Sequence, residues 1–132
     1  MNKCFILIIL SITLFSCKDT DETDVLPSIS FIQNQDYLSH DSTLLVGDDF
    51  TFSFHANANG NASNVLRNIS IIRKFEDKPA EKIDTLVNAE NIGLVKSFYA
   101  SELTGTEQWI IQAVDAYGNK NDLKFKIITT NN

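Results

Sequence analysis

The chain has 132 residues, of which 17 are Asp or Glu and 11 are Lys or Arg, so its formal net charge at pH 7 is −6. No run of Lys and Arg alternates with aromatic residues, and an acidic chain does not offer the basic stripe that a phosphate backbone requires. These numbers exclude nucleic acid as a partner and leave room for one folded domain with a single core.

The first 17 residues carry the strongest signal in the chain. A basic start at Lys3 precedes an apolar segment over 4–15, and residues 14–17 read Leu-Phe-Ser-Cys. Twelve apolar residues rise about 18 Å as a helix, well short of the roughly 30 Å hydrocarbon core of a bilayer, so they predict a cleaved secretory signal rather than a membrane span. Residues 14–17 resemble the lipobox of bacterial lipoproteins.

That resemblance implies that residues 1–16 are removed and that the mature chain begins at Cys17. Its thiol would carry diacylglycerol, and its amine would carry an N-linked acyl chain such as palmitate. Apart from this covalent lipid we expect no cofactor. Cys4 leaves with the signal and Cys17 is consumed by lipid, so the folded part has neither a thiol nor a disulfide. We therefore expect an exported protein held at the outer membrane by its lipid anchor.

The segment 17–27 is predicted to be a disordered acidic tether. Residues 18–24 carry five charges in seven positions and nothing large enough to bury. Fully extended, residues 18–27 reach at most about 33 Å. Lys18-Asp19, followed by Asp21 and Glu22, resembles the export signal of surface lipoproteins in some anaerobic Gram-negative bacteria, which implies the cell surface. The alternative is a plain solvated linker.

Residues 28–132 form the predicted domain, with 13 acidic and nine basic residues and hence a net charge of −4. Its hydrophobic pattern has a period of two, which predicts strands separated by turn residues. A helix over 81–91 is the rival interpretation of one segment, but Asp84, Thr85 and Asn88 are poor helix-interior residues. The segments predicted as strands are 29–33, 50–56, 67–75, 82–87, 94–100, 108–113 and 123–127.

Seven short strands predict an all-β fold, a single antiparallel β-sandwich. Alternation places the inward-facing side chains on one face of each strand. The predicted core comprises Phe50, Phe52, Phe54, Trp109, Ile111, Leu123 and Phe125.

Two segments resemble bacterial immunoglobulin-like domains. Residues 45–52 (Leu-Val-Gly-Asp-Asp-Phe-Thr-Phe) resemble the Gly-Asp entry into strand B, and 109–115 with Gly118-Asn119 resemble strand F and the F–G hairpin. That group includes the polycystic-kidney-disease-like and fibronectin-III-like modules. The resemblance implies an immunoglobulin-like sandwich, in which Trp109 stands where family members usually carry Tyr.

The sequence offers little for catalysis. His40 and His55 have no neighbouring nucleophile or metal partner, and the pair Asp48-Asp49 is better explained as a turn and strand start, since adjacent strand residues point to opposite faces. Asp, Asn and Gly over 115–122 could supply calcium ligands but are also ordinary turn residues, and the EF-hand spacing is absent. We therefore expect neither an enzyme nor a metal site.

The stretch 55–64 is rich in asparagine and too polar for a core. In the predicted sandwich the B–C and F–G loops lie at one end, where amides beside an exposed aromatic ring would suit a hydroxyl-rich ligand such as a glycan. A solvated loop is the alternative. The candidate ligand contacts are Asn59, Asn61, Asn64, Tyr117, Asn119 and Lys120.

These observations predict a non-catalytic binding or adhesion module at the outer membrane, with a glycan or protein ligand. The alternatives are an accessory subunit that joins a larger outer-membrane complex through a sheet edge and, less favoured, a hydrolase whose site the sequence hides. One geometric objection applies to the Asn-rich loop. The tether should enter at the same end, so a ligand from outside would first meet the opposite end, around 77–79 and Gly47-Asp48.

Overall fold

A computed structural model describes residues 25–61, 63–89 and 91–131. The predicted signal peptide 1–16, Cys17 and the tether up to residue 24 lie outside the described residues. Within the described part the chain contains strands, turns and loops but no helix, and accordingly no helix that could cross a membrane.

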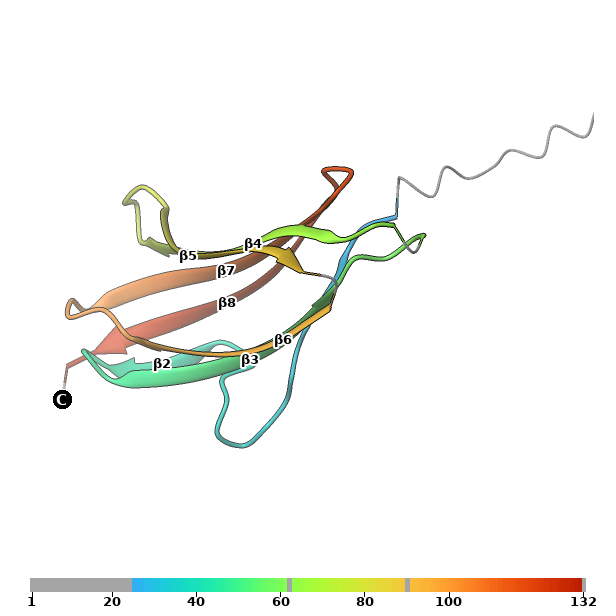
Figure 1. The fold of residues 1–132 in the computed structure, drawn as a ribbon. Helices are drawn as coiled ribbons and strands as arrows, with labels where there is room; N and C mark the ends of the chain where they lie inside the picture. Colours follow the sequence, from blue (N-terminus) through green and yellow to red (C-terminus); the bar gives the residue numbers. More distant parts are fainter. Residues whose placement is uncertain (1–24, 62, 90, 132) are drawn as a thin grey trace, which may run out of the picture.

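Two sheets pack face to face as a sandwich (Figure 1). One has three strands in the order β1-β3-β6, and the other has five in the order β2-β8-β7-β4-β5. The strands are β1 (Ser28–Phe31), β2 (Ser42–Leu45), β3 (Asp49–Asn57), β4 (Leu66–Phe75), β5 (Glu81–Ala89), β6 (Asn91–Tyr99), β7 (Gly105–Asp115) and β8 (Lys120–Thr130).

The period-two prediction is confirmed for all seven predicted segments, with bounds that differ by a few residues. The segment with a rival helical interpretation is the strand β5, which pairs with β4 along its length. Pairing satisfies its backbone groups and places Leu86 and Ile83 against the core, whereas Asp84 and Thr85 would weaken a helix.

The prediction of seven strands, all antiparallel, was incomplete. The eighth strand, β2, pairs in parallel with the end of β8, from Ser42 opposite Ile127 to Leu45 opposite Thr130. A tight turn then leads into β3: Asp48 accepts a 3.1 Å hydrogen bond from the Leu45 amide through Oδ2, and Gly47 adopts φ +76°. This confirms the prediction that Asp48-Asp49 is a turn and strand start. The short segment has too few residues to show alternation.

The core is a cluster of aromatic rings between the two sheets. Phe52 is fully buried, with ring centroids at 5.4 Å from Phe125, 5.7 Å from Phe98 and 6.4 Å from Trp109. Every predicted core residue is buried except Leu123, which is only partly buried and packs on the rim of the cluster. β4 adds apolar side chains that the sequence analysis did not single out, namely Leu66, Ile69 and Ile71.

The sandwich has two distinct ends. β1 begins at the end where β3 leads into β4 and where the hairpin joins β7 to β8, and we call this the anchor end. The opposite end, which we call the distal end, holds the β4–β5 hairpin, the β6–β7 turn and the C-terminus (Figure 1). The predicted grouping of the strand A start with the B–C and F–G loops at one end is therefore confirmed.

Candidate functional site

Asp115 organises the anchor end. This carboxylate is fully buried and accepts hydrogen bonds from Asn64 Nδ2 (3.0 Å), the Tyr117 amide (3.0 Å), and both the amide (2.8 Å) and Nδ2 (2.9 Å) of Asn119. Burial raises the pKa of Asp115, but the hydrogen bonds from Asn64, Asn119 and Tyr117 outweigh it, and the net pKa lies below the ordinary value. Asp115 thus holds the β7–β8 hairpin and the β3–β4 loop together.

The other predicted contact residues of the anchor end, except Lys120, also form side-chain hydrogen bonds within the described part of the domain. Asn59 Nδ2 donates to the Leu26 carbonyl at 2.9 Å, and Asn61 Nδ2 lies 3.2 Å from the hydroxyl of Tyr117. Asn119 Nδ2 reaches the Val25 carbonyl at 3.4 Å. These amides tie the incoming chain and the hairpin to the β3–β4 loop.

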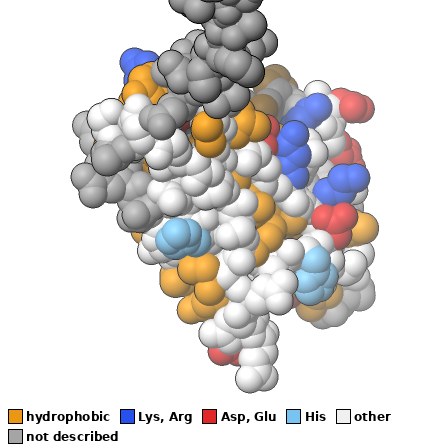
Figure 2. Space-filling model, turned by 90° about the vertical axis from the view of Figure 1, so that its right-hand side faces the viewer, with side chains coloured by type: hydrophobic (Ala, Val, Ile, Leu, Met, Phe, Trp, Pro, Cys, Tyr) orange, Lys and Arg blue, Asp and Glu red, His pale blue; other side chains and the backbone are white. Residues whose placement is uncertain are grey.

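The structure therefore brings together the candidate residues of the two loops. Asn64 is 6% exposed, contrary to the prediction that this stretch is too polar to be buried. Its amide is buried because Asp115 and the Asn59 carbonyl accept from it. Tyr117 is 44% exposed and Lys120 is exposed. Figure 2 looks at the anchor end and shows charged side chains gathered on one side, with a largely uncharged surface elsewhere.

The two histidines lie on the surface, as predicted. His55 belongs to the outward face of β3, opposite Ser30 on β1, and His40 lies in the loop before β2. Among the described residues, no group of three or more His, Cys, Asp or Glu could hold a metal ion. Among the residues that could have supplied calcium ligands, Asp115 accepts from amide groups and Asn121 Nδ2 donates to the Pro27 carbonyl, which fits the turn interpretation.

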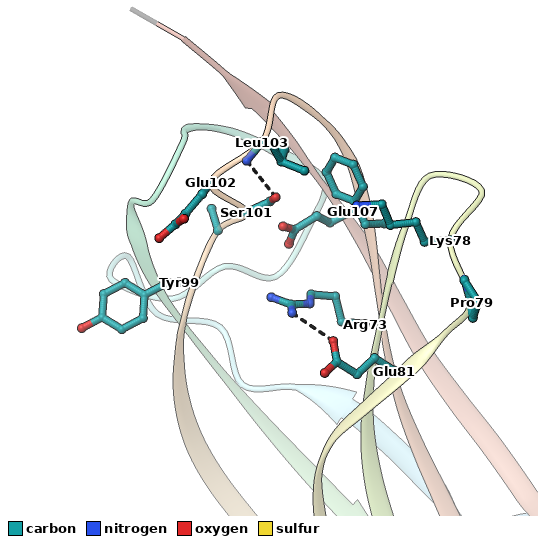
Figure 3. Close-up of a pocket in the computed structure, with 11 residues that line it drawn as sticks. Arg73, Lys78, Pro79, Glu81, Tyr99, Ser101, Glu102, Leu103 and Glu107 are labelled. Carbon is teal, nitrogen blue, oxygen red and sulfur yellow. Dashed lines mark hydrogen bonds and ion pairs between the residues drawn. The ribbon is translucent and has the colours of Figure 1, made fainter.

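A pocket of about 530 Å³ lies at the distal end, between the β4–β5 hairpin and the β6–β7 turn (Figure 3). Such a volume lies within the range of small-ligand sites, about 300–1,000 Å³. The lining combines charged, aromatic and apolar side chains from both sheets. The lining residues are Arg73, Phe75, Lys78, Pro79, Glu81, Tyr99, Ala100, Ser101, Glu102, Leu103 and Glu107.

Glu107 is the unusual member of this pocket. The alternation of β7 places it on the inward face with Trp109 and Ile111, and it is fully buried. Its Oε2 accepts a 2.8 Å hydrogen bond from the indole N–H of Trp109, while its Oε1 is buried with no hydrogen-bond partner. A buried carboxylate oxygen without a hydrogen-bond partner is costly and therefore calls for an explanation.

The cations of the pocket already have partners. Arg73 forms a 3.1 Å ion pair with Glu81, and its guanidinium lies 5.9 Å from the centroid of the Trp109 ring. Lys78 lies 5.1 Å above the Phe75 ring. A β-bulge between β4 and β5 follows Ile71 and sets the register of Arg73 opposite Glu81.

Gly105 permits the tight approach of β7 to the β4–β5 hairpin. It adopts φ +149°, and a Cβ atom there would clash with Glu76 Oε1 and lie 2.7 Å from the Phe75 ring. The Glu76 amide also donates to the Thr106 carbonyl at 2.9 Å. Since only glycine fits, this contact fixes the Phe75 wall of the pocket against the start of β7.

An ion pair joins the two sheets along their open side. Lys96 on β6 and Asp84 on β5 are 2.6 Å apart, although the two strands belong to different sheets. The hydrogen bond from Lys96 lowers the pKa of Asp84, burial opposes this, and the Thr85 amide adds to the lowering. Inward-pointing charges at sheet edges also discourage the addition of another strand.

Sequence reasoning missed the distal pocket, although the signal was present. Extending the alternation of β7 backward from Trp109 places Glu107 on the inward face, an unusual position for an acid. Lys78 and Pro79 belong to the stretch expected to meet an outside ligand first, and they line the pocket. The contributions of Arg73, Tyr99 and Glu102 depend on the pairing of strands distant in sequence.

No protein-family model matches the chain, and a comparison with curated protein sequences finds no match. Several solved structures are similar in fold. A superoxide reductase (neelaredoxin) from Ignicoccus hospitalis gives a TM-score of 0.53 at 12% identity over 80% of each chain. The sporulation control protein Spo0M from Bacillus subtilis gives 0.50 at 9% identity, over 82% of this chain and 51% of its own.

A family 123 glycoside hydrolase from Clostridium perfringens gives a TM-score of 0.51 at 9% identity, over 82% of this chain and 28% of the hydrolase. These proteins have unrelated descriptions and little sequence in common with this chain. A shared sandwich hosts many functions. The comparisons therefore show one thing, that this chain is an all-β sandwich domain of a widely used architecture.

Proposed function

We propose that this chain is a lipid-anchored outer-membrane protein, displayed on the cell surface, whose sandwich is a non-catalytic binding or adhesion module for a glycan or protein ligand. The sandwich would belong with the polycystic-kidney-disease-like or fibronectin-III-like bacterial modules, as residues 45–52 and 109–115 suggest. The lipid would be attached at Cys17 and the acidic tether 17–27 would separate the domain from the membrane.

The observation that carries this proposal is the position of the distal pocket. The chain enters the sandwich at the anchor end, where Asn59, Asn119 and Asn121 hold the carbonyls of residues 25–27. A protein tethered there presents its opposite end outward, and the pocket opens at that end. The amides of the anchor end are engaged in bonds within the domain, which supports a structural role for them.

The accessory-subunit alternative receives less support. Joining a complex through a sheet edge requires a strand edge that accepts another strand. At β5 and β6, two of the four edge strands, the Lys96–Asp84 ion pair occupies the inner side and disfavours such pairing. A concave pocket with a buried acid and an exposed Tyr99 favours ligand binding instead.

Surface labelling tests the proposed display. A Glu102→Cys variant places a thiol at the mouth of the pocket in a mature chain whose other cysteine, Cys17, is expected to be lipidated. A membrane-impermeant maleimide should label this variant on intact cells, and the unmodified chain serves as the blank. Adding Cys17→Ala should remove the label from cells, because the protein loses its anchor. Labelling only after permeabilisation of the outer membrane would contradict surface display.

The same adduct tests binding. A bulky maleimide on Glu102→Cys caps the pocket of the purified chain, whereas the same adduct on Ser63→Cys modifies an exposed turn at the anchor end. Any ligand that saturates the uncapped chain should be excluded by the first adduct and tolerated by the second. Retained binding with the pocket capped would remove the basis of the proposal.

A further inference from the structure

Glu107 determines what the distal pocket can accept. Its side chain is fully buried, and Oε1 has no partner in the structure. In the view of Figure 3 its carboxylate points toward the space between Ser101 and Arg73. Since Trp109 already donates to Oε2, a ligand that reaches this carboxylate must bring a hydrogen-bond donor for Oε1.

The charges around the pocket favour a cationic donor. Three carboxylates line it, on Glu81, Glu102 and Glu107, against two cations, on Arg73 and Lys78. Arg73 is paired with Glu81, and Lys78 lies over the Phe75 ring. A hydroxyl would donate one neutral hydrogen bond to the free oxygen, whereas an ammonium group would donate a charge-assisted one that also suits the excess of acidic over basic side chains in the lining.

The depth of Glu107 favours a slender ligand. The walls above it include apolar surfaces from Phe75, Pro79, Ala100 and Leu103. A flexible alkyl chain with a charged end buries its stem along such walls while its nitrogen reaches the acid. Leu103 is 54% exposed and lies in the turn between β6 and β7, so its side chain is not part of the core.

We infer that the distal pocket binds a primary ammonium group on an extended alkyl chain, as on the lysine side chain of a peptide, with Glu107 as its carboxylate partner. This inference rests on the proposed function and names the ligand chemistry of the same pocket. Exposed Tyr99 at the rim offers an aromatic face to the remainder of the peptide.

Calorimetry on the full chain in a non-ionic polyoxyethylene detergent tests the inference. The probes are Nα-acetyl-lysine methylamide, its neutral Nε-acetyl derivative, glucosamine and maltose. We expect the lysine probe alone to bind, and Glu107→Gln to weaken it by about tenfold or more, because a charged hydrogen bond is lost. Glu107→Asp keeps the carboxyl group but shortens the side chain, so its affinity for the lysine probe should lie between those of the unmodified chain and Glu107→Gln.

The matched control is Asp36→Asn, which removes one charge from the loop between β1 and β2 and does not line the pocket. It should leave the affinity within about twofold, and thermal melting of each variant identifies any that fail to fold. Equal binding of the Nε-acetyl derivative, or binding of maltose or glucosamine in place of the lysine probe, overturns the inference but leaves a ligand site in the pocket. Absence of lysine-probe binding up to about 10 mM also overturns it.

Discussion

Phe52→Ala is expected to lower the free energy of unfolding by about 3–5 kcal/mol, a large share of the roughly 5–15 kcal/mol of a typical domain. Phe52 is fully buried, and its ring lies within 6.4 Å, centroid to centroid, of Phe50, Phe54, Phe98, Trp109 and Phe125. The truncation removes contacts with both sheets and leaves a cavity that surrounding strands cannot close. Urea unfolding followed by tryptophan fluorescence measures the loss.

Tyr99→Ala provides the matched control on the neighbouring strand. This aromatic side chain is 71% exposed, so its truncation should change the free energy of unfolding by less than about 1 kcal/mol. If Phe52→Ala does not fold, Phe52→Leu retains most of the volume and should cost about 1–2 kcal/mol. Equal losses at the two aromatic positions would contradict the packing of the sandwich around Phe52.

Asp115→Asn is expected to lower the free energy of unfolding by about 2–3 kcal/mol at pH 7. The new amide places its own N–H donors against the N–H donors of Asn64 and Asn119, whose hydrogen bonds the carboxylate accepts. Asp122→Asn is the control. Asp122 accepts from Gln112 and lies 3.6 Å from Lys124 at the surface, so its replacement should cost less than about 1 kcal/mol.

The cost of Asp115→Asn should also depend on pH. The folded-state pKa of Asp115 lies below its ordinary value of 3.8, so the folded state binds this proton more weakly than the unfolded state. The stabilisation is complete above the unfolded pKa and disappears as the pH falls through the lower folded pKa. Urea unfolding of both proteins should show the difference shrinking below about pH 4. A difference that stays constant from pH 7 down to pH 2 would contradict the role of the charged form.

The strand pattern of the domain could be predicted from the sequence because half-buried strands alternate. β3 shows this most clearly, with Phe50, Phe52 and Phe54 inward and His55 outward. β2 could not be predicted in the same way, because its four residues form a strand only through parallel pairing with β8. Short strands depend on partners distant in sequence, and a local pattern cannot reveal them.

The candidate site was harder to predict because composition does not distinguish a loop that binds a ligand from a loop whose side chains form hydrogen bonds within the domain. The asparagines of the anchor end have the donors and acceptors of a glycan site, yet Asn59, Asn64 and Asn119 use them for backbone carbonyls and for Asp115. Glu107 shows the reverse case. Its residue type is typical of a surface position, yet the register of β7 places it beside Trp109 in the interior.

The central claim is that ligands bind at the distal end of the sandwich. Amide chemical-shift mapping of the ¹⁵N-labelled chain during titration with Nα-acetyl-lysine methylamide, glucosamine and maltose tests it most directly. The account predicts shifts confined to the pocket segments 73–81 and 99–107, with the amides of 57–61, 63–64 and 115–119 unchanged. Shifts gathered instead on the β3–β4 loop and the β7–β8 hairpin would place the site at the anchor end and contradict the account.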